Sequence, residues 1–490
     1  MSAGPAHAEP RALHECREAI KSVLPPGWLF SIEPKDAILR VLVENNPGRL
    51  RTHYSQRYAE LKAKRRRRWA RVFDAYGHAS DQTPSKPFES WVSSYTGRQL
   101  PEHEMISWLD STMSRILELR PIRILEIGCG AGLLLERLAP RCEHYTGIDI
   151  SAASIRQISS RLDALPNKGV NVRLSLAGAE DLPRLAVGTF DVVILNSVIQ
   201  YFHDADHLRE VLRSLRPVLE PGGSIFVGDI RHLGLLATFR LSVAIAKAAP
   251  DARVGDVRDQ AARAVAAESE LLLHPVFFED MCRDEPWIAS AEIMLKRGSF
   301  ANELSKYRYD VVLRTHAPAV TDAWLDCAAG DMPLSGVQDI LRRADVAALT
   351  LRGLRNARIE GDLSDLFFLE AADSADLASK VLAENRHDTR GIDPEELWKL
   401  GERHGYRTRI GWSRSGDAFL DAFFCRSEIF AAPPDGVPRG ARDFASANEP
   451  FAIELNALLE SELRRTIGEW PLPLEFVFLP AGELMRYTSK

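Results

Sequence analysis

The 490-residue chain lacks the features that mark several large classes of protein. Its six cysteines are scattered and none forms a C-x-x-C pair, so we expect neither a disulfide framework nor a cysteine-based zinc site. This cysteine usage predicts a reducing, cytoplasmic setting and no metal ion. The start of the chain has no apolar core, so we expect no secretory signal peptide. We find no internal repeat and no low-complexity block.

Long apolar runs and an excess of positive charge are also absent. The most apolar helical stretch, residues 233–249, carries Arg240 and Lys247 and is too short to span a bilayer. The net charge of −6 gives no general reason to expect nucleic acid. One basic run, residues 62–71, fits either a nucleic-acid patch or the solvated face of a helix that buries Trp69 and Phe73 on its other side. We favour the helix, and so predict neither a nucleic-acid nor a membrane partner.

The most informative segment that is present is Arg123-Ile-Leu-Glu-Ile-Gly-Cys-Gly-Ala-Gly132. It predicts a buried strand, a turn of three alternating glycines (Gly128, Gly130, Gly132) and a helix from residue 133 to 138. A glycine turn at a helix N-terminus suits an adenosine-containing ligand. Glu126 would repel a pyrophosphate, but it suits a ligand that carries a cationic amino acid and a sulfonium. The segment therefore predicts S-adenosylmethionine as the cofactor and argues against NAD.

The apolar pattern after residue 121 alternates strands with helices, which is typical of an α/β protein with a parallel sheet. Two further apolar runs predict an antiparallel pair that completes the sheet, and a mostly helical segment predicts a cap over the site. The expected parallel strands are 123–127, 144–149, 170–176, 190–196 and 223–229, the antiparallel pair is 291–295 and 309–314, and the cap is 231–280.

These patterns also predict the organisation of the whole chain. Residues 1–95 are expected to form a helical N-terminal region, and residues 96–316 the α/β core with its cap. Residues 317–430 are expected to form a smaller α+β region. A Pro/Gly-rich linker, 432–440, then leads into a tail, 441–490.

The ends of the second and third strands supply further candidate cofactor-binding residues. Asp149 lies 23 residues after Glu126, close to the ~20-residue offset at which an acidic residue meets a ribose diol. We favour this role for Asp149, with Ile150 beside it, over a simple helix cap, which Ser151 could provide equally well. After the third strand, Ala179 and Glu180 are candidates to read the adenine edge, although a plain polar loop would look the same.

The fourth and fifth strands place polar residues at the carboxyl edge of the sheet, where open α/β sheets bind ligands. The fourth strand leads into Asn196, Ser197 and Tyr201, without the two prolines and aromatic residue of a DNA amine methyltransferase. We therefore expect no methylation of nucleic-acid bases. The fifth strand leads into Asp229 and His232. His232 is a candidate general base, and a purely structural histidine is an equally good interpretation.

Taken together, these motifs resemble the methyltransferase domains embedded in non-ribosomal peptide synthetases, most of which methylate nitrogen. The resemblance covers residues 69–426, and it implies a class I S-adenosylmethionine-dependent fold with a seven-stranded sheet. In synthetases this domain is inserted within an adenylation domain, and residues 441–490 faintly resemble the end of such a host. The motifs that carry it are residues 88–97, 125–135, 196–202, 227–231, 295–298, 302–310, 391–398 and 405–412.

The resemblance also implies which residues surround the acceptor nitrogen. The predicted catalytic group is Asp229, His232, Tyr201, Asn302 and Glu303, with Tyr307 and Tyr309 as second choices. Tyr95 is expected to cover the methionine end of the cofactor. Residues 302–308 also fit an exposed connection with no role in the site. The family usually has asparagine at the position of His232, so this chain departs from the family in its substrate pocket.

Several functions remain open from the sequence. The leading hypothesis is an N-methyltransferase that acts on a small amino-acid-derived substrate, either free or bound to a carrier protein of a synthetase. A C- or O-methyltransferase of a small molecule is the nearest alternative. A non-catalytic scaffold that binds the cofactor and docks on a synthetase is a third. A nucleic-acid methyltransferase rests only on the basic run around Arg65–Arg68.

Overall fold

The computed structural model of the chain forms two compact units. One comprises Met1–Arg67 with Glu449–Lys490, and the other comprises Arg68–Asn448. We describe each unit by itself. The structure describes residues 9–24, 28–35, 38–44, 47–77, 88, 91–164, 171–185, 188–316, 324–343, 347–385, 390–426, 446–468 and 473–479.

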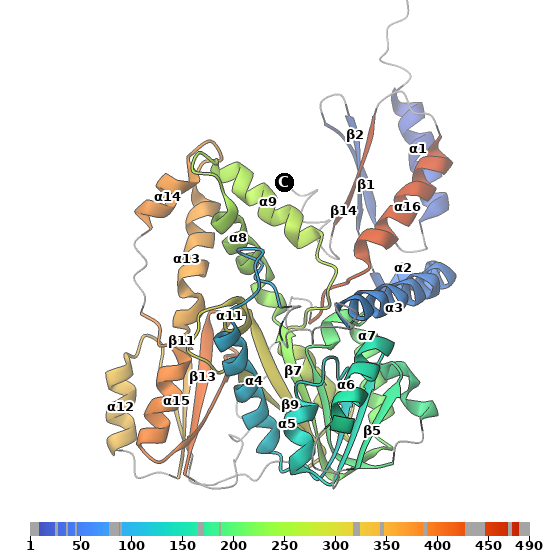
Figure 1. Cartoon of the computed structure of the whole chain (residues 1–490). Coiled ribbons are helices and arrows are strands. Elements are labelled where there is room, and N and C mark those ends of the chain that lie inside the picture. The colour runs from blue at the N-terminus through green and yellow to red at the C-terminus, as the bar shows by residue number, and fades with distance from the viewer. Residues whose placement is uncertain are drawn as a thin grey trace, which may run out of the picture. The chain divides into compact units, whose positions relative to one another are not determined.

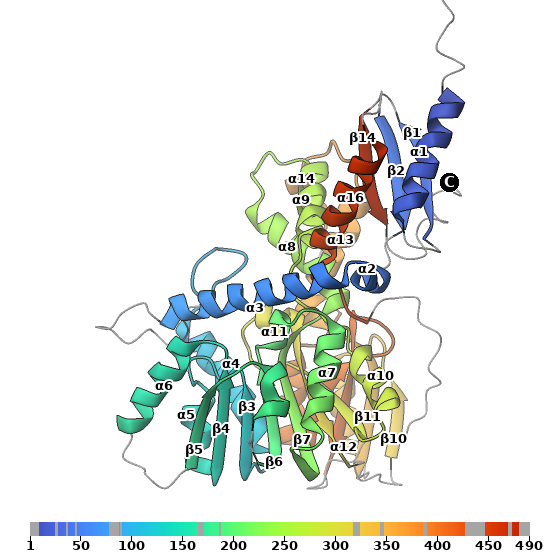
Figure 2. The same ribbon diagram turned by 90° about the vertical axis from the view of Figure 1, so that its right-hand side faces the viewer.

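The larger unit contains a seven-stranded sheet in the order β5-β4-β3-β6-β7-β9-β8 (Figure 1). The first five strands in this order are parallel, and Figure 2 shows them side by side. The last two are antiparallel, so the predicted α/β fold and the predicted antiparallel pair are confirmed. The strands are β3 (Arg123–Ile127), β4 (His144–Asp149), β5 (Asn171–Leu176), β6 (Phe190–Asn196), β7 (Leu219–Arg231), β8 (Ser290–Leu295) and β9 (Arg308–Arg314).

Both faces of this sheet are buried, because alternate residues of its strands are apolar on either side. In β3, Leu125 and Ile127 pack in one core with α7 and α10, whereas Ile124 packs in the other with α4, α5 and α6. The result is a three-layer arrangement of helices, sheet and helices. The helices are α4 (Glu102–Leu117), α5 (Leu135–Leu138), α6 (Ala152–Ala164), α7 (Ala205–Leu215) and α10 (Val276–Asp284).

The chain runs outward from β3 through β4 to β5 and then returns to β6 on the other side of β3. Such a reversal of strand order opens a crevice outside the carboxyl ends of the two central strands. The glycine turn follows β3 and Asn196 ends β6, so the predicted cofactor residues lie on both sides of this reversal.

The predicted cap is helical, with α8 (Leu236–Lys247) and α9 (Val254–Ala266) leading to α10. Beyond β9 the chain forms a second sheet, in the order β10-β11-β13-β12. Gly411 of β12 lies so close to β8 that a Cβ atom there would sit 2.6 Å from the Ile293 carbonyl oxygen. The elements of this region are β10 (Trp324–Ala328), α12 (Leu334–Arg343), β11 (Ala348–Arg355), α13 (Ala357–Ala371), α14 (Ala378–Glu384), α15 (Pro394–Arg403), β12 (Arg407–Trp412) and β13 (Phe419–Cys425).

The smaller unit joins the two ends of the chain. Its sheet has the order β1-β2-β14, in which β14 from the C-terminal segment runs parallel to β2 from the N-terminal segment. Arg40 donates to Glu475 at 2.7 Å across this pair. The elements are α1 (Glu9–Val23), β1 (Phe30–Lys35), β2 (Ile38–Glu44), α2 (Pro47–His53), α16 (Ala452–Ile467) and β14 (Leu474–Leu479), and α3 (Ser55–Gly77) begins here.

This unit corrects the prediction of a wholly helical region over residues 1–95. Residues 30–35 and 38–44 are strands, because they pair with each other and with β14, more than 400 residues away in the sequence. The helical interpretation of the basic run is confirmed, since residues 62–71 lie within α3. Among the described residues no helix is long and apolar enough to cross a membrane. The predicted linker 432–440 and residues 480–490 of the predicted tail lie outside the described part of the chain.

Candidate active site

The three glycines of the turn after β3 all have positive φ, at +77°, +48° and +77°. A side chain is strained in this region of backbone conformation. A Cβ atom on Gly128 would lie 2.6 Å from the Val198 side chain, whereas the nearest atom to a Cβ on Gly130 would be 4.0 Å away. The turn is therefore tightly packed at its first glycine and open above its second.

Asp149 connects the end of β4 to this turn. Its Oδ2 accepts from the Gly130 N–H at 2.8 Å, and its Oδ1 accepts from the Ser151 N–H at 2.8 Å. The Ser151 hydroxyl in turn accepts from Ser154 N–H, so Ser151 caps α6, as the sequence allowed. Burial raises the pKa of Asp149. Its carboxylate faces the glycine turn, where a ribose bound beside it would lie, and Ile150 follows at the same edge.

Glu126 lies beneath the turn. Its side chain is 3% exposed and accepts from the Tyr145 hydroxyl at 2.5 Å. Burial raises the pKa of Glu126 to about 8. The charge that we expected to attract a cationic ligand is therefore suppressed near neutral pH in the ligand-free protein.

These residues fit S-adenosylmethionine. The space above Gly130 is open, a carboxylate stands at the end of the neighbouring strand, and both lie where the strand order reverses. At the end of β5, Ala179 and Glu180 begin a short 3₁₀ helix, Ala179–Arg184, which places them at the same carboxyl edge.

The ends of β6 and β7 bring several predicted residues together. Ser197 and Asp229 both have positive φ, +56° and +64°, which is rare for non-glycine residues and is concentrated at functional sites. The Ser197 hydroxyl donates to Asp229 Oδ2 at 3.0 Å and lies 3.3 Å from Asn196 Nδ2. The amide oxygens of Asn196 and Gln200 are buried and lack a hydrogen-bond partner among the described residues.

Asp229 is fully buried and is surrounded by donors. Besides Ser197, the Trp108 indole donates to Oδ1 at 3.2 Å and Arg308 donates to Oδ2 at 2.6 Å. The ammonium group of Lys296 lies 3.9 Å from Oδ1. The Asp229 N–H donates to Asp310 at 2.8 Å. These donors tie the end of β7 to α4, β6 and β9, and the catalytic role of Asp229 stays a prediction.

Asn302 and Glu303 lie at the start of α11 (Glu303–Tyr307), a short helix where the sequence left an exposed connection possible. Asn302 caps this helix, and its Nδ2 donates to Glu104 at 2.7 Å. Glu303 accepts from both the N–H and the hydroxyl of Ser94 at 2.9 Å. Both side chains thus fasten the segment around residue 94 and α4 to the core.

The predicted tyrosines separate into different surroundings. The hydroxyls of Tyr95 and Tyr307 meet at Ser242, at 2.9 and 3.3 Å, and Tyr307 also donates to Asp362 at 2.5 Å. Tyr309 is fully buried, and its hydroxyl donates to the Leu273 carbonyl oxygen at 3.0 Å. Tyr309 is therefore part of the core.

His232 does not join the group around Asp229. Its ring lies against Trp412, Tyr309 and His274, with ring centroids 4.6, 5.6 and 5.2 Å apart. It is 1% exposed, and burial lowers the pKa of its imidazole to about 3. The ring is enclosed by these aromatic side chains and lies 3.8 Å from an Asp417 oxygen, and its role as general base stays a prediction.

The sequence pattern gave no indication that α3 contributes to the site. Asp74 accepts from the Ser151 hydroxyl at 2.8 Å and from the Ala153 N–H at 3.1 Å, beside Asp149. The rings of Trp69 and Phe73 lie 4.4 and 5.1 Å from the ring of Tyr201. Helical spacing predicted a buried face for α3 but not its location over the carboxyl edge of the sheet.

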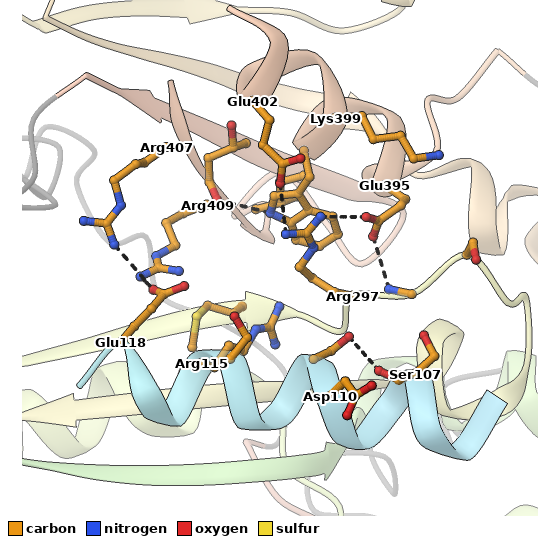
Figure 3. Close-up of a pocket in the computed structure, with 18 of the residues that line it drawn as sticks. Ser107, Asp110, Arg115, Glu118, Arg297, Glu395, Lys399, Glu402, Arg407 and Arg409 are labelled. Carbon is orange, nitrogen blue, oxygen red and sulfur yellow. Dashed lines mark hydrogen bonds and ion pairs between the residues drawn. The ribbon is translucent and has the colours of Figure 1, made fainter. Parts of the chain in front are cut away.

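A pocket of the larger unit lies elsewhere (Figure 3). It has a volume of about 580 Å³, and α4, α15, β12 and the segment after β8 line it. Its charges pair within the pocket: Arg297 binds Glu395 and Glu402 at 2.7 and 3.2 Å, and Arg407 and Arg409 both bind Glu118 (Figure 3). None of the predicted cofactor-binding or catalytic residues lines it.

Comparison with known proteins finds relatives of this chain. Residues 125–225 match the family model described as "Methyltransferase domain". The chain is 38% identical over 390 residues to "Chondramide synthase cmdD" of Chondromyces crocatus, covering 77% of this chain and 10% of that protein. It is 29% identical over 411 residues to "Nonribosomal peptide synthetase asqK" of Emericella nidulans, covering 80% of this chain and 16% of that protein. The chain thus spans less than a fifth of the length of these relatives.

Solved structures with a related fold include "N-methyltransferase NodS" from Bradyrhizobium japonicum, at 21% identity and a TM-score of 0.27, over 42% of this chain and 96% of that one. Another is "CalS10, an amino pentose methyltransferase from Micromonospora echinaspora", at 26% identity and a TM-score of 0.21, over 25% of this chain and 50% of that one.

Proposed function

We propose that this chain, which contains an S-adenosylmethionine-dependent methyltransferase domain related to non-ribosomal peptide synthetases, methylates the amine of a small amino-acid-derived substrate. The substrate is either free or bound as a thioester to a carrier protein. The relatives support this choice of substrate class, because one of them is named a nonribosomal peptide synthetase.

The observation that carries the proposal is the pair of buried amide oxygens on Asn196 and Gln200. Both lack a partner within the described residues, and an unsatisfied buried acceptor is costly unless a donor reaches it. An amine supplies N–H donors. The aromatic rings of Trp69 and Tyr201 lie 4.4 Å apart near Gln200, and such rings stabilise the positive charge that develops on a nitrogen during methylation.

When bound, S-adenosylmethionine supplies a methyl group from its sulfonium and leaves as a neutral thioether. The protein contributes mainly alignment, which can account for ~7–11 kcal/mol of a barrier when two reactants are well oriented. The pair of Ser197 and Asp229, joined by a hydrogen bond of 3.0 Å, connects the ends of β6 and β7, and the rings of Trp69 and Phe73 pack on Tyr201. The amine must be neutral when it reacts, so its proton leaves to solvent or to a neighbouring acceptor before the transfer.

A product assay by mass spectrometry tests the proposal. The protein and S-adenosylmethionine would be offered free amino acids, aminoacyl amides and carrier-bound aminoacyl thioesters in parallel. We expect a mass increase of one methylene on the nitrogen of at least one of these classes. Fragment ions that place the methyl group on carbon or oxygen would favour the alternative C- or O-methyltransferase, and labelling of thioesters alone would reject a free substrate.

Variants of Asn196 and Gln200, whose amide oxygens carry the proposal, make the assay more specific. We expect Gln200→Leu to lower kcat/KM at least tenfold, whereas Gln260→Leu on the exposed side of α9 leaves it unchanged. Calorimetry addresses the scaffold alternative. If the protein does not bind S-adenosylmethionine, or if Asp149→Ala binds it equally well, the glycine turn is not the cofactor site. Binding without any methylated product would favour a scaffold.

A further inference from the structure

Three side chains that are distant in the sequence converge in the larger unit. His232 follows the end of β7, His274 precedes α10, and Asp417 lies in the turn between β12 and β13. One ligand atom from each, a ring nitrogen or a carboxylate oxygen, lies within 4.8 Å of the other two. His274 Nε2 is 2.9 Å from Asp417 Oδ1, and His232 Nε2 is 3.8 Å from the same oxygen.

The unusual member of this cluster is His232. A neutral imidazole has one donor and one acceptor nitrogen, and buried histidines normally use both. Both ring nitrogens of His232 are buried and lack a hydrogen-bond partner among the described residues. The hydrogen bond between His274 and Asp417 explains why these two side chains lie together. It does not explain why the two ring nitrogens of His232 are buried beside them.

The surroundings admit the carboxylate and enclose the imidazole. A Cβ atom on residue 234 would lie 1.8 Å from Asp417 Oδ2, so only glycine at this position allows Asp417 to approach. The Trp412 and Tyr309 rings flank His232 at 4.6 and 5.6 Å. Neutral imidazole is the form that binds metal ions.

We propose that His232, His274 and Asp417 bind a divalent transition-metal ion of the zinc type. Two histidines and one carboxylate form a common ligand set for Zn²⁺ and leave a further coordination position open. Ligand atoms at ~2.0–2.1 Å from a tetrahedral ion lie ~3.3 Å apart, so the 2.9 and 3.8 Å separations need only small adjustments.

Binding would also rearrange the proton on His274. In the metal-free protein its Nδ1 accepts from the Val276 N–H at 3.3 Å, so Nε2 carries the proton that is donated to Asp417. Coordination through Nε2 requires that its proton leave to solvent or move to Nδ1, and in the second case the contact with the Val276 N–H is lost. That N–H belongs to the first residue of α10, where backbone donors have no partner within the helix. The Asp417 side chain is 32% exposed and provides an access route for the ion.

The expectation of no metal, drawn from the absence of a cysteine pair, could not have detected this cluster. His274 and Asp417 are 143 residues apart, so no local spacing brings them together. An ion here would tie together the end of β7, the start of α10 and the β12–β13 turn, and this role is independent of which substrate the protein methylates.

Zinc titration of the full chain tests the site. After removal of metal with a chelator, Zn²⁺ would be titrated in competition with a chromophoric chelator, and the melting temperature would be recorded with and without Zn²⁺. We expect one tight equivalent and a higher melting temperature for the wild type. His232→Ala and Asp417→Asn should bind at least a hundredfold more weakly and lose the increase in melting temperature.

His203→Ala is the matched control, because it removes a second pair of stacked histidines, His203 and His207, whose ring centroids are 4.5 Å apart. It should behave as the wild type. Asp417→Asn keeps the shape of the side chain and remains informative should His232→Ala not fold. Absence of a stoichiometric Zn²⁺ equivalent in the wild type, equal binding by all variants, or loss of binding only in His203→Ala would each refute the proposal.

Discussion

Replacing Glu126 with glutamine should change how the stability of the larger unit depends on pH. The folded-state pKa of Glu126 is about 8, against an ordinary value of 4.5, because the carboxyl group is buried beneath the glycine turn. A carboxyl whose pKa is raised on folding holds its proton more tightly in the native state. Its stabilising contribution is therefore complete below pH 4.5 and is lost as the pH rises through 8.

The size of the effect follows from the shift in pKa. One pKa unit corresponds to about 1.36 kcal/mol, so ionisation of Glu126 should remove up to about 3 kcal/mol from the free energy of unfolding between pH 5.5 and pH 8. Glutamine has no proton to lose and can still accept from the Tyr145 hydroxyl, so Glu126→Gln should flatten this dependence.

The measurement is urea denaturation of the ligand-free protein at several pH values, followed by tryptophan fluorescence. Glu143→Gln is the control, because Glu143 is exposed just before β4 and should follow the wild-type curve. Parallel loss of stability in the wild type and in Glu126→Gln would show that Glu126 is already ionised at neutral pH, and would refute our account of its burial.

Three further predictions concern the site and its supports. Gly128→Ala should lower the affinity for S-adenosylmethionine at least tenfold in calorimetry, because the new Cβ atom would lie 2.6 Å from Val198. Adding Val198→Ala should restore only part of this affinity, since the φ of +77° stays unfavourable for alanine. Arg308→Met should cost about 3–5 kcal/mol in denaturation, by leaving the buried carboxylate of Asp229 without its closest cation, and a double variant with Asp229→Asn should recover part of it. Tyr307→Phe should lower the free energy of unfolding by about 1.5–3 kcal/mol, since the Tyr307 hydroxyl donates to the Asp362 carboxylate. The value of kcat should change little. A large fall in kcat at unchanged stability would instead indicate that Tyr307 contacts the substrate.

The sheet could be predicted because its signals are local. Apolar runs such as residues 190–196 are bounded by turn residues, and five strands agree with their predicted ranges to within a few residues. The strands β1 and β2 could not be predicted in the same way. Their stability depends on pairing with β14, which lies more than 400 residues away in the sequence. The pattern of apolar residues within 30–44 does not indicate this distant partner.

The candidate site shows the same division. Glycine spacing indicated the turn, and the position of Asp149 at a strand end follows from the sequence alone. The donors around Asp229 come from residues 108, 197 and 308, and the carboxylate of Asp74 comes from a helix that precedes the whole core. Whether a polar residue supports the site or touches the substrate depends on such tertiary partners. The structure shows Asn302 bonded to Glu104 and Glu303 bonded to Ser94, and their catalytic role stays a prediction.

The smaller unit, built from both ends of the chain, has a consequence for folding. The pairing of β14 with β2 joins residues 1–67 to the segment after residue 448, so during synthesis this pairing waits until residues 68–448 have emerged. Closing a disordered loop of several hundred residues costs about 5 kcal/mol in chain entropy. If residues 68–448 fold first, the loop between β2 and β14 is no longer disordered. Most of this entropy cost is then already met by the folding of the larger unit. We therefore expect refolding in two ordered phases, in which the smaller unit forms last and slows whenever the larger one is destabilised.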